Sequence, residues 1–192
     1  MKYDFLVLGS SGMQGRIVVR DLLESGYKVC CSDLYREGSE RNLAQYPGTP
    51  FSFIDLRRYE EFRTFIRNTQ ASAIVNCAEG DWNHDVYRVC LDEARHVIDL
   101  GSDIPITKAQ LAMSNQFKDK GLVALTGCGS TPGINNVMCG YAVKSFSEID
   151  TIELGFAWDS NIKKFAVPFS MESIIEELTE PAPFLENGAW ME

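Results

Sequence analysis

The sequence lacks several features that would assign it to a function class at once. No apolar run in its 192 residues approaches the roughly 18 residues that a membrane span needs. Only two histidines are present, and the six cysteines form no Cys-x-x-Cys pair, so the clustered ligands of a zinc site are missing. The net charge is −9, without a basic stripe, which argues against a nucleic-acid partner because phosphate neutralisation dominates that affinity. We therefore expect no membrane contact, no bound metal and no nucleic acid.

The overall composition is that of an ordinary globular domain. Apolar residues make up 45% of the chain and charged residues 23%. The N-terminus runs directly into an apolar segment without a leader, which predicts a cytoplasmic location. In that reducing compartment we expect the cysteines to be unpaired and mostly buried in the core. They are Cys30, Cys31, Cys77, Cys90, Cys128 and Cys139.

Short apolar runs alternate with amphipathic stretches of helix length through the first two thirds of the chain. The pattern predicts strands over residues 5–8, 27–31, 51–54, 73–76, 96–98 and 122–125. It predicts helices over residues 13–25, 58–68, 84–94 and 106–119. Repeated βα units with right-handed crossovers indicate an α/β fold, a doubly wound parallel sheet of the Rossmann type, over residues 1–126.

The pattern changes after residue 126. A turn-rich loop leads into a predicted helix over 134–146, a half-buried strand over 151–158 and a short helix over 170–178. One strand and two helices cannot bury that apolar face alone. We expect residues 127–192 to begin a second, α+β domain that is truncated here; the alternative is an ordered tail packed on a dimer partner.

A glycine-rich loop connects the first predicted strand to the first predicted helix. It reads Gly9-Ser10-Ser11-Gly12-Met13-Gln14-Gly15. In this context the first glycine permits a tight turn, the second lets the backbone approach a pyrophosphate, and the third lets the helix pack close to the strand. The N–H groups at the helix start then bind the anion. The pattern predicts a dinucleotide site; the alternative is an ordinary βα turn.

Acids and amides at the carboxyl ends of later strands fit the same ligand. Asp33 ends the second strand, where a carboxylate accepts the adenosine ribose hydroxyls and repels a 2′-phosphate, so we expect NAD. Arg36 follows closely and leaves NADP possible. The rule that ligands lie at strand carboxyl ends adds further candidates. These are Asp55 and Leu56 after the third strand, and Asn76, Cys77 and Ala78 after the fourth.

Several separated motifs occur together in this chain. They are VLGSSGMQG (7–15), IVNCA (74–78), VCLDEA (89–94), HVIDL (96–100) and GCGSTPGINN (127–136), with a tail that includes PFSMES (168–173) and NG (187–188). In their order and spacing they resemble the saccharopine dehydrogenase-like oxidoreductases. The chain departs from the family at Ser10-Ser11, where many members have Ala-Gly, and at Glu79-Gly80.

The resemblance implies an NAD(P)-dependent enzyme that oxidises a C–N bond of an amino acid or polyamine derivative, as in lysine metabolism, and that forms a homodimer. Asp99 matches the family's aspartate after its fifth strand and, with nearby Asp103, is the candidate for proton transfer. Asp99 has a structural alternative, in which it accepts N–H groups of the turn at Gly101. A non-catalytic dinucleotide sensor with the same fold is the alternative function. A sugar-nucleotide epimerase needs a Tyr-x-x-x-Lys pair, in which the two residues are four apart. Tyr141 and Lys144 are only three residues apart, which argues against that function.

Overall fold

The computed structural model describes residues 2–101, 103–155, 163, 174–175, 178–179, 181 and 184–191. The chain divides into two compact units, Met1–Glu148 and Ile149–Glu192. The first unit contains every residue that the sequence predicts to bind the cofactor or to transfer a proton. Among the described residues no helix is both long and apolar enough to cross a membrane.

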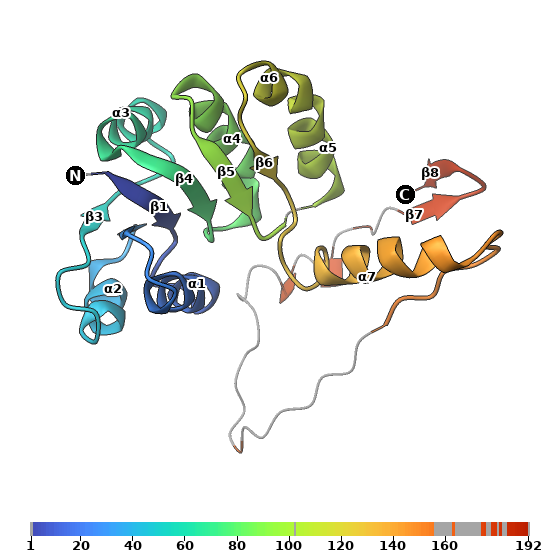
Figure 1. Cartoon of the computed structure of the whole chain (residues 1–192), viewed down its shortest axis with the longest axis horizontal. Helices are drawn as coiled ribbons and strands as arrows, with labels where there is room; N and C mark the ends of the chain where they lie inside the picture. The colour runs from blue at the N-terminus through green and yellow to red at the C-terminus, as the bar shows by residue number, and fades with distance from the viewer. Residues whose placement is uncertain are drawn as a thin grey trace. The chain divides into compact units, whose positions relative to one another are not determined.

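Six parallel strands form one sheet in the first unit, in the order β3-β2-β1-β4-β5-β6 (Figure 1). They are β1 (Tyr3–Leu8), β2 (Val29–Asp33), β3 (Phe51–Phe53), β4 (Ala71–Asn76), β5 (His96–Asp99) and β6 (Ala124–Leu125). The strand order reverses between β1 and β4, which is the switch point where ligands bind beyond the carboxyl ends. The predicted doubly wound Rossmann sheet is confirmed.

Helices cover both faces of this sheet, with α1 and α2 on one side and α3 to α6 on the other (Figure 1). They are α1 (Met13–Glu24), α2 (Arg36–Leu43), α3 (Tyr59–Thr69), α4 (Asn83–Asp92), α5 (Ile104–Ala112) and α6 (Ser114–Asp119). Alternate residues of β1 serve the two faces, as strand geometry requires. Leu6 and Leu8 join the core that contains Phe62 of α3, whereas Val7 packs with Val19 of α1.

Two helical segments differ from the sequence pattern. Helix α2 is not predicted, because residues 36–43 are almost entirely polar and show no apolar stripe. The helix predicted over 106–119 starts earlier, at Ile104, because Asp103 caps it through the N–H of Ile106. It also breaks at Met113, which separates α5 from α6.

The last helix of the first unit is α7 (Ile134–Ala142), followed by a short 3₁₀ turn at Val143–Ser145. Its apolar side chains lie on one stripe yet are largely exposed, as at Val137 and Tyr141. The first compact unit includes α7 and ends at residue 148. The sequence pattern instead predicts a domain boundary between residues 126 and 127. That boundary stays a prediction.

The second unit contains an antiparallel hairpin of β7 (Phe184–Glu186) and β8 (Ala189–Met191). Asn187 and Gly188 form its two-residue turn, with φ values of 49° and 78°; this Asn-Gly pair suits such a hairpin because both positions need positive φ. The hairpin was not predicted. Residues 151–155 carry none of the predicted strand. Residues 156–158 and most of the predicted helix over 170–178 lie outside the described residues.

Candidate functional site

The glycine loop is held by contacts between backbone atoms. Gly9 has a φ of 69°, and a Cβ there would lie 2.6 Å from the N of Ala78 and 2.7 Å from the carbonyl carbon of Cys77. A Cβ on Gly15 would lie 2.0 Å from the carbonyl oxygen of Gly9. Neither position can hold a side chain while the loop packs against the turn after β4. The first and third glycines of the motif therefore shape the loop, as the sequence pattern predicts.

Gly12, the middle glycine, leaves open space at the start of α1. A Cβ there would meet only the oxygen of Gly9, at 3.4 Å, and Gly12, Met13 and Gln14 are all exposed. No side chain caps α1 and no acidic residue lies in its first turn. The first-turn N–H groups, which an α-helix leaves unpaired, are thus accessible to an anion. A dinucleotide pyrophosphate fits this cradle, since both the helix dipole and the free N–H groups favour it.

The two serines of the loop point to different roles. Ser10 is buried, and both its N–H and its hydroxyl donate to the carbonyl oxygen of Ser32, at 3.1 and 3.2 Å. Its hydroxyl is therefore used to fasten the loop to β2. Ser11 donates its N–H to Asp33 Oδ2 at 2.8 Å, and its carbonyl accepts from Asn42 Nδ2 at 3.2 Å. Asn42 belongs to α2, so sequence reasoning had no reason to place it beside the loop.

Asp33 lies between the glycine loop and the start of α2. Its side chain is 8% exposed; Oδ2 accepts from Ser11 and Oδ1 accepts from the N–H of Tyr35 at 3.0 Å. A carboxylate has about four lone-pair sites, so two remain for further donors. The residue thus keeps the capacity to accept two ribose hydroxyls while it orders the loop.

Asp55 and Leu56 lie after β3, next to the end of β2, because the N–H of Ile54 donates to the carbonyl oxygen of Asp33 at 3.1 Å. The Asp55 carboxylate is paired with Arg57 through two bonds, 2.8 Å from Nε and 2.7 Å from the terminal nitrogen. The hydrogen bond from Arg57 holds the pKa of Asp55 at about 2. Asp55 is therefore a charged acceptor at this edge throughout the physiological range.

Of the three residues predicted at the end of β4, Cys77 and Ala78 meet the glycine loop and Asn76 supports them. Cys77 and Ala78 supply the backbone on which Gly9 packs, and burial raises the pKa of the Cys77 thiol to about 12. Asn76 is buried; its Oδ1 accepts from the N–H of Ala78 at 3.2 Å, and its Nδ2 donates to Asn83 Oδ1 at 2.7 Å. Asn76 therefore fixes the turn that supports the loop.

The two predicted catalytic aspartates have contrasting surroundings. Asp99 is fully buried and accepts hydrogen bonds from Tyr87, Gln110, Gly101 and Gly127. Asp103 is exposed and caps α5, with Oδ1 2.9 Å from the N of Ile106. The bond from Gly101 is the structural alternative that the sequence offers for Asp99. The bonds from Tyr87, Gln110 and Gly127 depend on tertiary packing, so the pattern could not find them. The catalytic assignments remain predictions.

The neighbours of Asp99 have altered acidity. Burial, and after it the hydrogen bond to Asp99, raises the pKa of Tyr87 well above its usual range. Burial and the nearby charge of Asp99 also raise the pKa of Cys128, so this exposed thiol is a poor nucleophile at neutral pH. The described residues contain no cluster of three or more histidine, cysteine or acidic side chains that could hold a metal.

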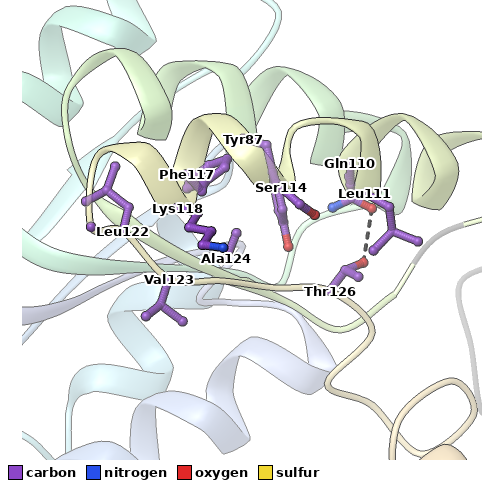
Figure 2. Close-up of a pocket in the computed structure, with 11 residues that line it drawn as sticks. Tyr87, Gln110, Leu111, Ser114, Phe117, Lys118, Leu122, Val123, Ala124 and Thr126 are labelled. Atoms are coloured by element: carbon purple, nitrogen blue, oxygen red, sulfur yellow. Dashed lines mark hydrogen bonds between the residues drawn. The ribbon is translucent and has the colours of Figure 1, made fainter.

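A pocket of about 440 Å³ opens beside β6, away from the glycine loop (Figure 2). Its walls come from α4, α5, α6 and the segment 121–126. In Figure 2 Gln110 and Thr126 face each other, joined by a hydrogen bond of 3.1 Å from Thr126 Oγ1 to Gln110 Oε1. None of the predicted cofactor residues lines this pocket, so it is separate from the cradle at α1.

Comparison with known proteins gives a consistent result for the first unit. Residues 5–89 match the NAD dependent epimerase/dehydratase family. The chain is 39% identical over 85 residues to carboxyaminopropylagmatine dehydrogenase from Synechocystis, covering 43% of this chain and 21% of that protein. It is 29% identical over 140 residues to carboxynorspermidine synthase from Vibrio alginolyticus, covering 65% of this chain and 33% of that protein. These similarities support the resemblance to the saccharopine dehydrogenase-like family that the sequence motifs indicate.

A solved structure agrees with this relationship at the level of the fold. Saccharopine dehydrogenase from Saccharomyces cerevisiae matches this chain with a TM-score of 0.61 at 13% identity, over 74% of this chain and 31% of that one. The chain spans between a fifth and a third of the length of the two relatives named above. The first unit has the fold of an NAD(P)-binding domain, and the predicted cofactor class is confirmed.

Proposed function

We propose that this chain is the cofactor-binding part of an NAD(P)-dependent oxidoreductase that acts on the C–N bond of an amino acid or polyamine derivative. The observation that carries the proposal is the uncapped, acid-free start of α1 beneath the exposed Gly12. The names of the relatives support the substrate class, since both refer to amine compounds that bear a carboxyl group. A cytoplasmic location and a homodimeric assembly remain predictions from the sequence.

In this proposal the residues of the first unit divide the cofactor between them. Gly9, Ser10 and Gly15 shape the loop, and Gly12, whose N–H donates to the carbonyl oxygen of Gly9, leaves room for the phosphates. The N–H groups of Met13 and Gln14 bind the pyrophosphate, joined by the Ser11 side chain. Asp33 accepts the adenosine ribose hydroxyls, and Asp55 with Leu56 borders the adenine. Asn76, Cys77 and Ala78 support the middle of the cofactor. When bound, the nicotinamide supplies the hydride acceptor.

Asp103 is the residue that we propose for direct proton transfer. Its carboxylate is exposed at the start of α5 and follows β5 at the carboxyl edge of the sheet. One oxygen bonds to the N–H of Ile106, which orients the group and leaves the other oxygen available. A general base must come within hydrogen-bond reach of its substrate, and an exposed side chain at this edge meets that condition.

The test of the cofactor assignment is a fluorescence titration of the full chain with NADH and NADPH, repeated for Asp33→Ala. Removing the ribose acceptor should weaken NADH binding by about 10- to 100-fold, the range for hydrogen bonds to a charged group. NADPH should be affected less, because the charge that repels its 2′-phosphate is removed as well. The ratio of the two affinities is the decisive quantity, since any general damage to the loop would weaken both cofactors alike.

Asp21→Ala is the matched control, because Asp21 is an exposed acid on α1 and its loss changes the net charge equally. An unchanged NADH to NADPH ratio in Asp33→Ala would refute the role of Asp33, and no binding of either cofactor by the wild-type chain would refute the site. Oxidation of amino acids and polyamines is followed by the absorbance of the reduced nicotinamide. Cofactor binding without any turnover across this panel would favour the sensor alternative over the enzyme.

A further inference from the structure

The carboxylate of Asp99 joins four separate segments of the first unit. Oδ1 accepts the N–H groups of Gly101 at 2.7 Å and Gly127 at 2.8 Å. Oδ2 accepts from the Tyr87 hydroxyl at 2.6 Å and from Gln110 Nε2 at 2.7 Å. These donors belong to the turn after β5, the loop after β6, α4 and α5. The four lone-pair sites of the carboxylate are therefore all used.

This arrangement prevents Asp99 from reaching a substrate. The residue is 0% exposed, and its carboxylate could take a proton from a ligand only after losing one of these four bonds. A buried carboxylate that loses a hydrogen bond also loses compensation for its desolvation. The geometry thus favours a fixed acceptor over a group that exchanges protons during each turnover.

The segment that Asp99 holds most directly is the loop over residues 126–133. The main-chain oxygen of Asp99 also accepts the N–H of Cys128 at 2.8 Å. The loop packs closely on the turn after β5: a Cβ on Gly129 would lie 2.6 Å from the carbonyl oxygen of Leu100, and one on Gly101 would lie 2.9 Å from Cγ of Pro132. The 126–133 loop and the turn after β5 therefore pack tightly together, and Asp99 bonds to both of them.

The turn after β5 is also connected to the turn that supports the glycine loop. The carbonyl oxygen of Gly101 accepts from Asn83 Nδ2 at 3.1 Å, and Asn83 Oδ1 accepts from Asn76. Asn76 in turn accepts the N–H of Ala78, on whose backbone Gly9 packs. A continuous series of contacts therefore runs along the carboxyl ends of β4, β5 and β6, where the second half of a dinucleotide lies in this fold.

We propose that Asp99 is a positioning residue, which locks the 126–133 loop onto the turn after β5 and so shapes the nicotinamide side of the site without touching substrate or cofactor. This inference rests on the proposed function for the meaning of the site, although the locking itself is independent of it. Asp99 and Asp103, which the sequence treats as one catalytic pair, then have different roles.

The test compares Asp99→Asn with Asp99→Ala in the full chain. An asparagine can keep its oxygen on the N–H groups of Gly101 and Gly127, while its amide donates to the Tyr87 hydroxyl and, after a flip of the Gln110 amide, to Oε1 of that residue. The asparagine variant should therefore retain NADH affinity and turnover within about threefold. The alanine variant should lose both, because no acceptor remains. If Asp99 were a general base, both variants would be inactive, so the asparagine variant distinguishes the two roles.

Amide hydrogen exchange supplies a readout that does not need cofactor or activity. In Asp99→Ala the amides of Gly101 and Gly127 should exchange about 10- to 100-fold faster, the effect of one hydrogen bond to a charged acceptor on a local opening. Exchange in α1 should not change. Asp119→Asn, an exposed acid of α6, is the control. If Asp99→Ala fails to fold, Tyr87→Phe removes one donor and should raise exchange at Gly127 by a smaller factor.

Three results would overturn the proposal: unchanged exchange in the loop of Asp99→Ala; unchanged exchange in Tyr87→Phe where the alanine variant cannot be studied; or an Asp99→Asn protein with wild-type exchange and NADH binding but no turnover. The last would assign Asp99 to the chemistry. Failure of the wild-type chain to bind NADH or NADPH would refute the proposed function instead, and the exchange experiment would still decide whether Asp99 locks the loop.

Discussion

Exchanging single glycines of the loop for alanine should separate cofactor binding from folding. At Gly12 the backbone is extended, with φ −65° and ψ 169°, and an added methyl would meet only one atom, at 3.4 Å. Alanine is compatible with that conformation and restricts the unfolded chain, whereas an N-cap position prefers glycine to alanine. Because these effects oppose each other, Gly12→Ala should leave the unfolding free energy within about 1 kcal/mol of wild type. The same methyl occupies the approach to the first-turn N–H groups of α1.

The expected effect of Gly12→Ala on cofactor binding is larger. If the methyl lengthens one charge-assisted hydrogen bond to the pyrophosphate, the loss is about 1.5–3 kcal/mol, which corresponds to roughly 10- to 100-fold weaker binding of NADH. Gly15→Ala should behave differently, because its Cβ would lie 2.0 Å from the oxygen of Gly9 and 2.9 Å from Cα of Ser10. Backbone atoms cannot move aside without separating α1 from β1, so we expect a loss of stability of about 3 kcal/mol or more.

Urea unfolding measures the unfolding free energy of each variant, and fluorescence titration measures its affinity for NADH. Gly140→Ala is the control, since this residue of α7 has open space around its Cβ position and gains only helix propensity. A Gly12→Ala protein that binds NADH as tightly as wild type would show that the pyrophosphate does not use this cradle. A Gly15→Ala protein of wild-type stability would refute the reasoning from backbone contact.

Two further predictions concern the structure that carries the site. Glu93 accepts hydrogen bonds from Arg67 and Arg63, which lower its pKa from the ordinary 4.5 to about 2; the folded state therefore favours the ionised form, and its contribution to stability is present above pH 4.5 and lost as the pH falls towards 2. Glu93→Gln should be less stable than wild type at neutral pH, with a difference that shrinks over that range in thermal melts; a constant difference would contradict it. Ile66→Ala, at a fully buried position of α3, should cost about 2–5 kcal/mol in urea unfolding, and a cost below about 1 kcal/mol would show that the core closes over the gap.

The sequence predicts the sheet well because its signals are local. Each parallel strand is an apolar run that ends at a polar or glycine residue, and the glycine spacing identifies the turn before α1 without any tertiary information. The contacts of Gly9 with Cys77 and Ala78 follow from the switch-point rule, since residues after β1 and β4 must be neighbours. These parts of the site could be predicted.

Other parts depend on contacts that no local pattern contains. Helix α2 is polar, and its position is visible only through Asn42, which reaches the carbonyl of Ser11. The four donors of Asp99 are spread over residues 87 to 127. The sequence pattern therefore could not predict that every lone-pair site of its carboxylate accepts a hydrogen bond. The hairpin at Asn187-Gly188 is a different case, because its turn signal is local and strong, whereas its two strands are only three residues long each.

The glycine loop also limits how this site can diverge. The atoms that set its shape belong to the main chains of Gly9, Gly15, Cys77 and Ala78, so exchanging the side chain of Cys77 or Ala78 cannot tune the distance between the two turns. Descendants of this sequence should inherit the loop unaltered as a rigid frame. Changes of cofactor preference should instead accumulate at the positions whose side chains we propose to contact the cofactor, first of all at Asp33 and Ser11.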